Sequence, residues 1–180
     1  GDVKIADQDF SKEHMLSARV ARFKDRNPTK KMFVDCAVDG HEREISMVIG
    51  PGVNEDPAHN PAITDYKDFS VGMIEAPPGN GASLHIHDTI EVFMPLKGNW
   101  GIYWLDNDGN EQEALLAPWD VVSVPPGCWR GFRNRSDEEG VLFAINGGTD
   151  SGRVKWPQEM LDAAAAKGLT LGEDGFIQDA

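Results

Sequence analysis

Short apolar segments alternate with turns rich in glycine and proline along most of this chain. Between residues 69 and 146 the pattern predicts eight strands, at 69–76, 82–87, 90–96, 99–105, 111–116, 120–124, 130–134 and 140–146. Short strands at such even spacing are typical of an all-β sandwich or barrel, whereas a parallel sheet would need crossover helices between them. The sequence therefore predicts an all-β fold built as a small closed barrel.

The segments before this region are less regular. Residues 1–16 are polar and predict a loose arm, and alternation at 17–23, 31–38 and 43–49 predicts three further strands. Residues 50–68 form a long loop rich in Pro, Asn, Asp and Gly. A loop of that length in a compact domain is often functional, and a surface excursion over the end of the barrel explains it equally well.

The C-terminal segment carries the signals of a short helix. Pro157 suits a first helical turn, Glu159 is favoured there by the helix dipole, and Lys167-Gly168 supplies a basic last turn and a stop. We therefore expect a helix over 157–167 that packs against the barrel. The expected organisation has three parts: an N-terminal arm, strands and loop at 1–68, the barrel core at 69–147, and the C-terminal helix and tail at 148–180.

Charge and composition exclude several classes of protein. The chain has 30 Asp and Glu against 17 Lys and Arg, a formal net charge of −13. This balance argues against a nucleic-acid partner and against docking on an anionic membrane. No apolar run reaches the roughly 20 residues of a membrane span, and no signal peptide is visible. Cys36 and Cys128 are interpreted as two reduced thiols, so we expect a cytoplasmic protein.

Two histidines and a glutamate form the strongest chemical signal. His85 and His87 are separated by one residue, so on an extended strand they project from the same face, with Cα atoms about 6.5–7 Å apart. Glu91 follows a short reversal and is expected to face the same point. Two imidazoles and one carboxylate form the facial set of non-haem Fe(II) oxygenases. A buried trio of this kind also needs a compensating partner, because buried imidazoles and carboxylates are costly when they are unpaired.

The spacing of these residues resembles the cupin superfamily. The first cupin motif is matched at every position, by Gly79, His85, His87, Glu91 and Gly98. The second motif is matched by Pro125, Gly127 and Asn134, but Trp119 stands in place of its opening glycine and Arg130 in place of its metal-binding histidine. The resemblance covers roughly residues 69–147. It implies a cupin-type jelly-roll barrel with a metal in its mouth, and a homodimer formed through the N-terminal strands.

Arg130 leaves three arrangements open, because a guanidinium stays protonated and cannot replace an imidazole as a ligand. In the first, a divalent metal (Fe, Mn, Ni, Cu or Zn) binds His85, His87 and Glu91, and Arg130 anchors an anionic substrate. In the second, the metal is absent and Arg130 pairs with Glu91. The third arrangement has His41 or His59 completing the metal sphere while Arg130 swings out.

Two classes of function follow from these arrangements. The leading hypothesis is a metal-dependent small cupin enzyme that acts on a small organic anion, with oxygenase, isomerase or lyase chemistry. The alternative is a metal-free barrel that binds a small ligand without catalysis, for which an Arg130–Glu91 hydrogen bond is the expected sign. A structural or regulatory domain of a larger system is weakened by the absence of a DNA-binding segment or a long linker.

Overall fold

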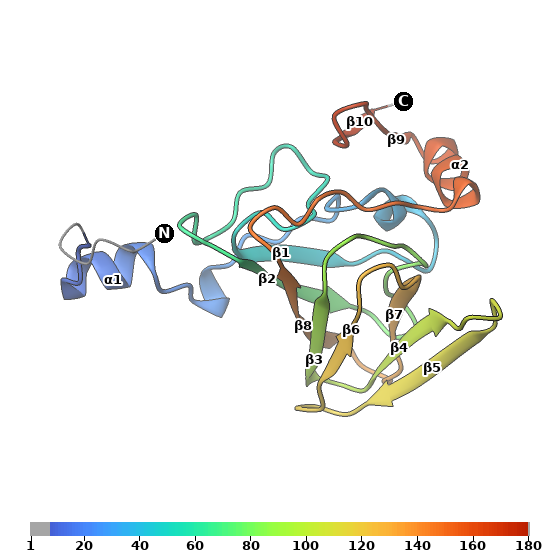
Figure 1. Cartoon of the computed structure of the whole chain (residues 1–180), viewed down its shortest axis with the longest axis horizontal. Helices are drawn as coiled ribbons and strands as arrows, with labels where there is room; N and C mark the ends of the chain where they lie inside the picture. The colour runs from blue at the N-terminus through green and yellow to red at the C-terminus, as the bar shows by residue number, and fades with distance from the viewer. Residues whose placement is uncertain (1–7, 180) are drawn as a thin grey trace.

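The computed structural model describes residues 8–179 and is built around two antiparallel sheets packed face to face (Figure 1). The larger sheet has the strand order β1-β2-β8-β3-β6 and the smaller one the order β5-β4-β7. The larger sheet consists of β1 (Glu44–Ile49), β2 (Phe69–Ala76), β8 (Gly140–Gly147), β3 (Glu91–Lys97) and β6 (Val122–Val124). The smaller consists of β5 (Glu111–Leu116), β4 (Trp100–Leu105) and β7 (Arg130–Asn134). This arrangement is consistent with the expected jelly roll, but the two sheets are not joined into the closed barrel that the strand pattern predicts.

The core lies between the two sheets. Every second residue of each central strand points inward, and Phe93, Trp100 and Phe132 meet there with ring centroids 5.3 and 6.0 Å apart. Phe93 and Trp100 are 0% exposed. Each such side chain contributes about 1.5–3 kcal/mol through its burial. The sheets are therefore held together by an apolar interior that the polar site described below interrupts at one end.

Most of the predicted strands are present, but one within residues 69–146 and two before residue 43 are not. Strands at 43–49, 69–76, 90–96, 99–105, 111–116, 120–124, 130–134 and 140–146 are confirmed to within two residues at their ends. The strand at 82–87 is wrong, because only the isolated bridges of His85 with Arg130 and of Ile86 with Lys155 form there.

The strands expected at 17–23 and 31–38 are also wrong. The first segment contains the end of helix α1 (Lys12–Ala18), an irregular stretch at 19–22 and the start of the 3₁₀ turn η2 (Phe23–Asp25). Ser11 caps α1 by accepting the N–H of His14 at 3.2 Å. The second segment is the 3₁₀ turn η3 (Val34–Ala37), which buries Val34, Asp35 and Cys36 together. A strand would send Asp35 to the opposite face from its neighbours, so the turn is needed to bury all three. Residues 1–7 of the expected arm lie outside the described part of the chain.

The C-terminal helix is confirmed as α2 (Gln158–Ala166), with Pro157 as its N-cap. A short hairpin of β9 (Leu169–Leu171) and β10 (Ile177–Asp179), which the sequence did not indicate, follows it. Ala164 of α2 packs with Val34, Val53 and Trp156 in a second, smaller core at one end of the barrel.

Cys36 is buried, Cys128 is half-buried, and both are free thiols. Within residues 8–179, no helix has the length and apolar character that crossing a membrane requires.

Candidate functional site

His85 and His87 reach the barrel interior on a short extended segment that pairs with β7. The N–H of His85 donates to the carbonyl of Arg130 at 2.8 Å, and the N–H of Arg130 donates back at 2.9 Å. Ile86 lies between the histidines and bridges Lys155 on the other side. The alternation therefore sends both imidazoles inward, where His85 is 6% and His87 1% exposed.

Both imidazoles are held through their Nδ1 atoms. Nδ1 of His85 lies 2.8 Å from the Ser83 carbonyl, and because a carbonyl only accepts, this nitrogen carries the hydrogen. Nδ1 of His87 lies 3.1 Å from the Thr89 hydroxyl. Burial lowers the pKa of His85 to about 4, with Glu91 opposing and the Arg130 charge adding to the effect. His85 is therefore a neutral imidazole at neutral pH, with its Nε2 lone pair available.

Glu91 begins β3 and brings the carboxylate to the same place. Its Oε1 lies 3.4 Å from Nε2 of His87 and 3.3 Å from Nε of Arg130. Burial by itself raises the pKa of Glu91, but the favourable charges inside the cluster outweigh it and leave the pKa lowered, and the positive charge of Arg130 is the one of these that faces its Oε1 directly. The carboxylate is therefore ionised inside the barrel, with Arg130 as its counter-charge.

Arg130 occupies the centre of the cluster. It is 0% exposed and donates from Nη2 to Nε2 of His87 at 3.0 Å, from Nε to Glu91 and from Nη1 to the Cys128 carbonyl at 2.7 Å. Because a guanidinium only donates, Nε2 of His87 must be the acceptor, and the hydrogen of this ring is on Nδ1. Arg130 thus uses the same lone pairs of His87 and Glu91 that a metal ion would use.

The donor atoms of His85, His87 and Glu91 all lie within 4.8 Å of one another, so these three residues could hold a metal ion if Arg130 were not beside them. Imidazoles tied through Nδ1 to an oxygen are also typical of metal ligands. The positive charge of Arg130 opposes metal binding by these three residues. A divalent ion about 4 Å from its charge would be repelled by about 8 kcal/mol at an effective dielectric of about 20. In the arrangement that the structure shows, the site does not fit a divalent metal.

Neither of the other candidate histidines belongs to this cluster. His59, on the 50–68 loop, accepts the N–H of Met47 at Nε2, at 3.0 Å. His41 contacts the Gly81 carbonyl through Nδ1 at 2.8 Å. The metal-ligand cluster found among the described residues includes neither of them, so the expectation that one completes a metal sphere is not supported by their positions.

Charged residues outside the cupin motifs support the site and were missed by the sequence argument. Asp35 accepts hydrogen bonds from Arg43 Nη2 and from the N–H of Ser83, both at 2.9 Å, and Ser83 in turn holds His85. Arg43 and Asp35 are 4% and 0% exposed. Arg43 lies two residues before the inward-facing Ile45, so the alternation of a strand could have predicted that Arg43 also faces inward.

Glu55 and Trp156 form a second support. Glu55 is 1% exposed and accepts the Trp156 indole N–H and the Val34 N–H, each at 2.9 Å. The ring of Trp156 packs on that of His85, with centroids 5.3 Å apart. Three segments that are distant in sequence thus meet behind His85, and no local pattern could have indicated this contact.

The second cupin motif contributes structure at Trp119 and Asn134. Trp119 has φ 74°, the left-handed conformation that the motif's glycine would adopt without strain, and its side chain is 73% exposed. The Asn134 amide donates to the Ala76 carbonyl at 3.0 Å and to the Glu138 carbonyl at 2.7 Å. These contacts fix the far end of β7, so that Arg130 at its beginning is held in register.

Two hollows adjoin the cluster. A cavity of about 40 Å³ lies against His85 and Glu91 and is lined mainly by apolar side chains, which leaves room for water-sized molecules. A groove of about 900 Å³ runs between the β4–β5 turn and residues 122–130, with Cys128 and Arg130 among its lining residues. Since Arg130 has no exposed surface, a ligand in the groove reaches its guanidinium only after the covering side chains move.

Comparison with known proteins gives one family and a set of similar folds. Residues 72–146 match the family model described as "Cupin domain". The structure of Lactobacillus farciminis oxalate decarboxylase in a formate complex aligns with a TM-score of 0.55 and 15% identity, over 77% of this chain and 36% of that chain. An oxalate oxidase structure aligns with a TM-score of 0.57 and 15% identity, over 88% of this chain and 68% of that chain.

A cupin 2 domain-containing protein from Halorhodospira halophila aligns with a TM-score of 0.52 and 21% identity, over 69% of this chain and 77% of that chain. The curated proteins contain no match. At these identities the likenesses show the fold alone. The present chain also spans only 36% of the oxalate decarboxylase, so that enzyme's activity is not transferred by the alignment.

Proposed function

Because residues 72–146 form a cupin domain, we propose that the barrel is a metal-free binding site for a small organic anion, with Arg130 as its internal cation. One observation carries this proposal. The buried guanidinium hydrogen-bonds to both His87 and Glu91, the residues that would otherwise ligate a metal. The pair of Arg130 and Glu91 is neutral overall, which removes the need for a second cation in a buried site.

Arg130 would also recognise the ligand. Three of its five N–H groups are used, by Glu91, His87 and the Cys128 carbonyl, which leaves one on each Nη atom. Two such N–H groups can hold a carboxylate through two parallel hydrogen bonds. The groove lined by Cys128 and Arg130 supplies the approach for an organic ligand that is larger than the inner cavity.

The test is metal binding by Arg130→His, which restores the histidine of the cupin motif. We expect the wild type, purified without added metal, to hold far less than one equivalent of Fe, Mn, Ni, Cu or Zn. Arg130→His should bind Zn²⁺ or Co²⁺ at least about 100-fold more tightly in titration calorimetry, because the repulsion is removed and a fourth ligand is added. Arg133→His, three residues along the same strand and half-buried, is the matched control and should behave as the wild type.

A second assay addresses the ligand. Formate, acetate, oxalate and malonate are titrated into the wild type and into Arg130→Gln, which keeps hydrogen-bonding capacity but has no charge. Binding of a carboxylate to the wild type, with at least tenfold weaker binding to the variant, is the expected result. Equal binding of the carboxylate by both proteins would show that the charge of Arg130 does not recognise the ligand.

The second candidate function is a metal-dependent cupin enzyme, with oxygenase, isomerase or lyase chemistry on a small anion. It is favoured by the donor set of His85, His87 and Glu91 within 4.8 Å and by the Nδ1 contacts of both imidazoles. Metal binding would require the Arg130 guanidinium to move away from Nε2 of His87. Stoichiometric metal in the wild type, lost on His85→Ala, would establish this candidate and overturn the metal-free site.

A further inference from the structure

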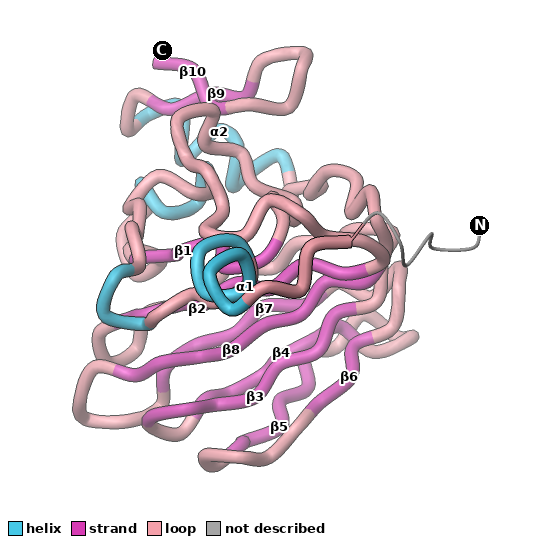
Figure 2. Tube along the Cα trace, turned by 90° about the vertical axis from the view of Figure 1, so that its left-hand side faces the viewer, coloured by secondary structure: helices cyan, strands magenta, loops and turns pink. Residues whose placement is uncertain are grey.

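The inner face of the larger sheet carries three polar side chains at one end. The register pairs Ser70 of β2 with Asn146 of β8, and Asn146 with Glu91 of β3. Figure 2 shows these three strands as neighbours in the sheet. Residues directly opposite each other have Cβ atoms about 4.5–5.5 Å apart, so the three side chains form one continuous row. All three are buried, and we call them the polar row.

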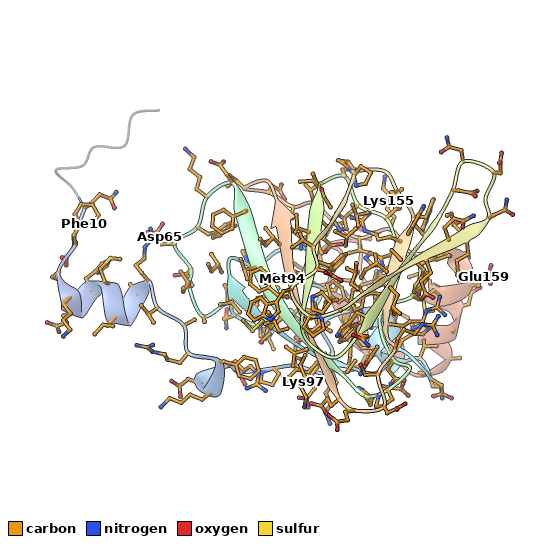
Figure 3. All side chains as sticks on the ribbon, turned by 90° about the horizontal axis from the view of Figure 1, so that it is seen from below. Phe10, Asp65, Met94, Lys97, Lys155 and Glu159 are labelled. Atoms are coloured by element: carbon orange, nitrogen blue, oxygen red, sulfur yellow. The ribbon has the colours of Figure 1, made fainter. Side chains whose placement is uncertain are left out.

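The polar row lies at the end of the barrel that holds the histidines. Glu91 is the first residue of β3 and Lys97 the last. Lys155 pairs through its backbone with Ile86, which lies between the two histidines. Figure 3 labels Lys155 and Lys97 far apart, on opposite sides of the view. The carboxylate of Glu91 lies close to His85, so the row and the histidine segment share one end of the interior.

Three buried polar atoms in this region have no hydrogen-bond partner among residues 8–179. They are Oγ of Ser70, Oδ1 of Asn146 and Nε of Arg43. Their residues are 0%, 7% and 4% exposed. Buried polar groups nearly always have a partner, because an unpaired one has given up its hydrogen bonds to water. Asn146 and Arg43 both line the inner cavity of about 40 Å³, so a molecule inside it can supply the missing partners.

The inner cavity exists because two small residues face each other. Gly72 and Ala144 come next to Ser70 and Asn146 on the inner face, and the register pairs them directly. A volume of about 40 Å³ accommodates about three non-hydrogen atoms, at roughly 10–15 Å³ for each water-sized position. Most of its lining is apolar. The occupant is therefore a small group with a short apolar stem and one polar end.

The polar groups that line the cavity include donors and acceptors. Nε of Arg43 donates, the Glu91 carboxylate and Nε2 of His85 accept, and the Asn146 amide does both. A hydroxyl group also donates and accepts, so it can pair with groups of either kind. An ammonium group only donates and would lie beside the charge of Arg43. A carboxylate only accepts and would lie beside the Glu91 carboxylate. A neutral hydroxyl group therefore fits best.

Glu91 connects the inner cavity with the anion site. It lines the cavity, and its Oε1 lies 3.3 Å from Nε of Arg130. A ligand whose carboxylate pairs with Arg130 can thus place a group one or two carbons away in the cavity. We propose that the inner cavity recognises a hydroxyl group and that the ligand is a short monocarboxylic hydroxy acid; the second half of this statement rests on the anion site proposed above for Arg130.

The first test compares pairs of acids that differ by one hydroxyl group, acetate with glycolate and propionate with 3-hydroxypropionate, by titration calorimetry. In at least one pair, the hydroxy acid should bind the wild type at least about tenfold more tightly. Asn146→Leu has a similar size but no hydrogen-bonding group, and it should lose this preference while it binds the plain acid as before. Asn99→Leu is the matched control, exposed at the opposite end of the barrel, and should keep the preference.

The second test uses a neutral probe, so that it does not depend on the anion site. Ethylene glycol is titrated into ¹⁵N-labelled protein, and the side-chain amide signal of Asn146 is followed by NMR. We expect a saturable shift in the wild type and the same shift in Arg130→Gln. Ala144→Val fills the cavity and should abolish the shift, and with it the preference for hydroxy acids.

The outcomes separate the two proposals. Equal affinities within both pairs of acids, with no saturable glycol shift, would leave only water in the cavity and overturn the hydroxyl site, while the Arg130 site would stand. Tighter binding of glycine or malonate than of glycolate would assign the cavity to an ammonium group or a second carboxylate, and would also overturn it. If no carboxylate binds, the Arg130 site and the hydroxy acid are both excluded, and a saturable glycol shift would still support the hydroxyl site.

Discussion

Glu55 should make the stability of this protein fall as the pH rises from 4.5 to about 7. Its carboxyl group is 1% exposed and accepts two N–H groups, from Val34 and Trp156, and no cation among residues 8–179 forms an ion pair with it. Burial raises the pKa of Glu55 from 4.5 to about 7, and the two hydrogen bonds oppose this only in part. The neutral acid is therefore the form that the folded protein prefers.

The sign and size of the effect follow from linkage. Between pH 4.5 and about 7 the folded state holds a proton on Glu55 that the unfolded chain has released, so unfolding becomes easier as the pH rises. The contribution is fully present below pH 4.5 and is lost as the pH passes about 7. The difference between the two pKa values corresponds to about 3 kcal/mol of unfolding free energy.

The assay is urea unfolding at pH values from 4.5 to 8.5, for the wild type, Glu55→Gln and Glu159→Gln. Glu55→Gln cannot titrate at this position. The unfolding free energy of the wild type minus that of Glu55→Gln should therefore fall by about 3 kcal/mol across the range. Glu159 is exposed in the first turn of α2, and its variant should follow the wild type. A wild type and Glu55→Gln with parallel pH curves, or a difference of the opposite sign, would refute the argument.

Two further substitutions test the support of the site and the backbone strain. Asp35→Asn removes the charge that pairs with buried Arg43 and should lower the unfolding free energy by about 3–5 kcal/mol; a loss below about 1 kcal/mol in urea unfolding would contradict a buried, uncompensated guanidinium. Trp119→Gly should raise the melting temperature, because relief of the φ 74° conformation, worth about 1–2 kcal/mol, exceeds the roughly 0.5–1 kcal/mol of chain entropy that glycine adds. A lower melting temperature would show that the exposed indole has a stabilising contact.

The sequence predicted the barrel well because its signals there are local. Alternation with a period of two gives each strand an inner and an outer face, and glycines such as Gly98, with φ 80°, mark the turns. The same rule sent His85 and His87 to one side, and the structure places their donor atoms near Glu91. The prediction failed at 17–23 and 31–38, where a few alternating residues also fit short helices whose form depends on capping by Ser11 and on the burial of Asp35.

By itself, the sequence determined the all-β fold, the positions of its central strands and the presence of two histidines, a glutamate and an arginine at one end of the barrel. Only the tertiary structure decided what these groups do to one another. Arg130 is thirty-nine residues from Glu91, and packing places its Nε 3.3 Å from the Glu91 carboxylate in the barrel interior. Glu55 and Trp156 are 101 residues apart, and they meet because the loop and the tail close over the same end of the barrel. Periodicity describes which face a residue occupies, but distances between remote segments, and the pKa values that depend on them, arise only when the chain has packed.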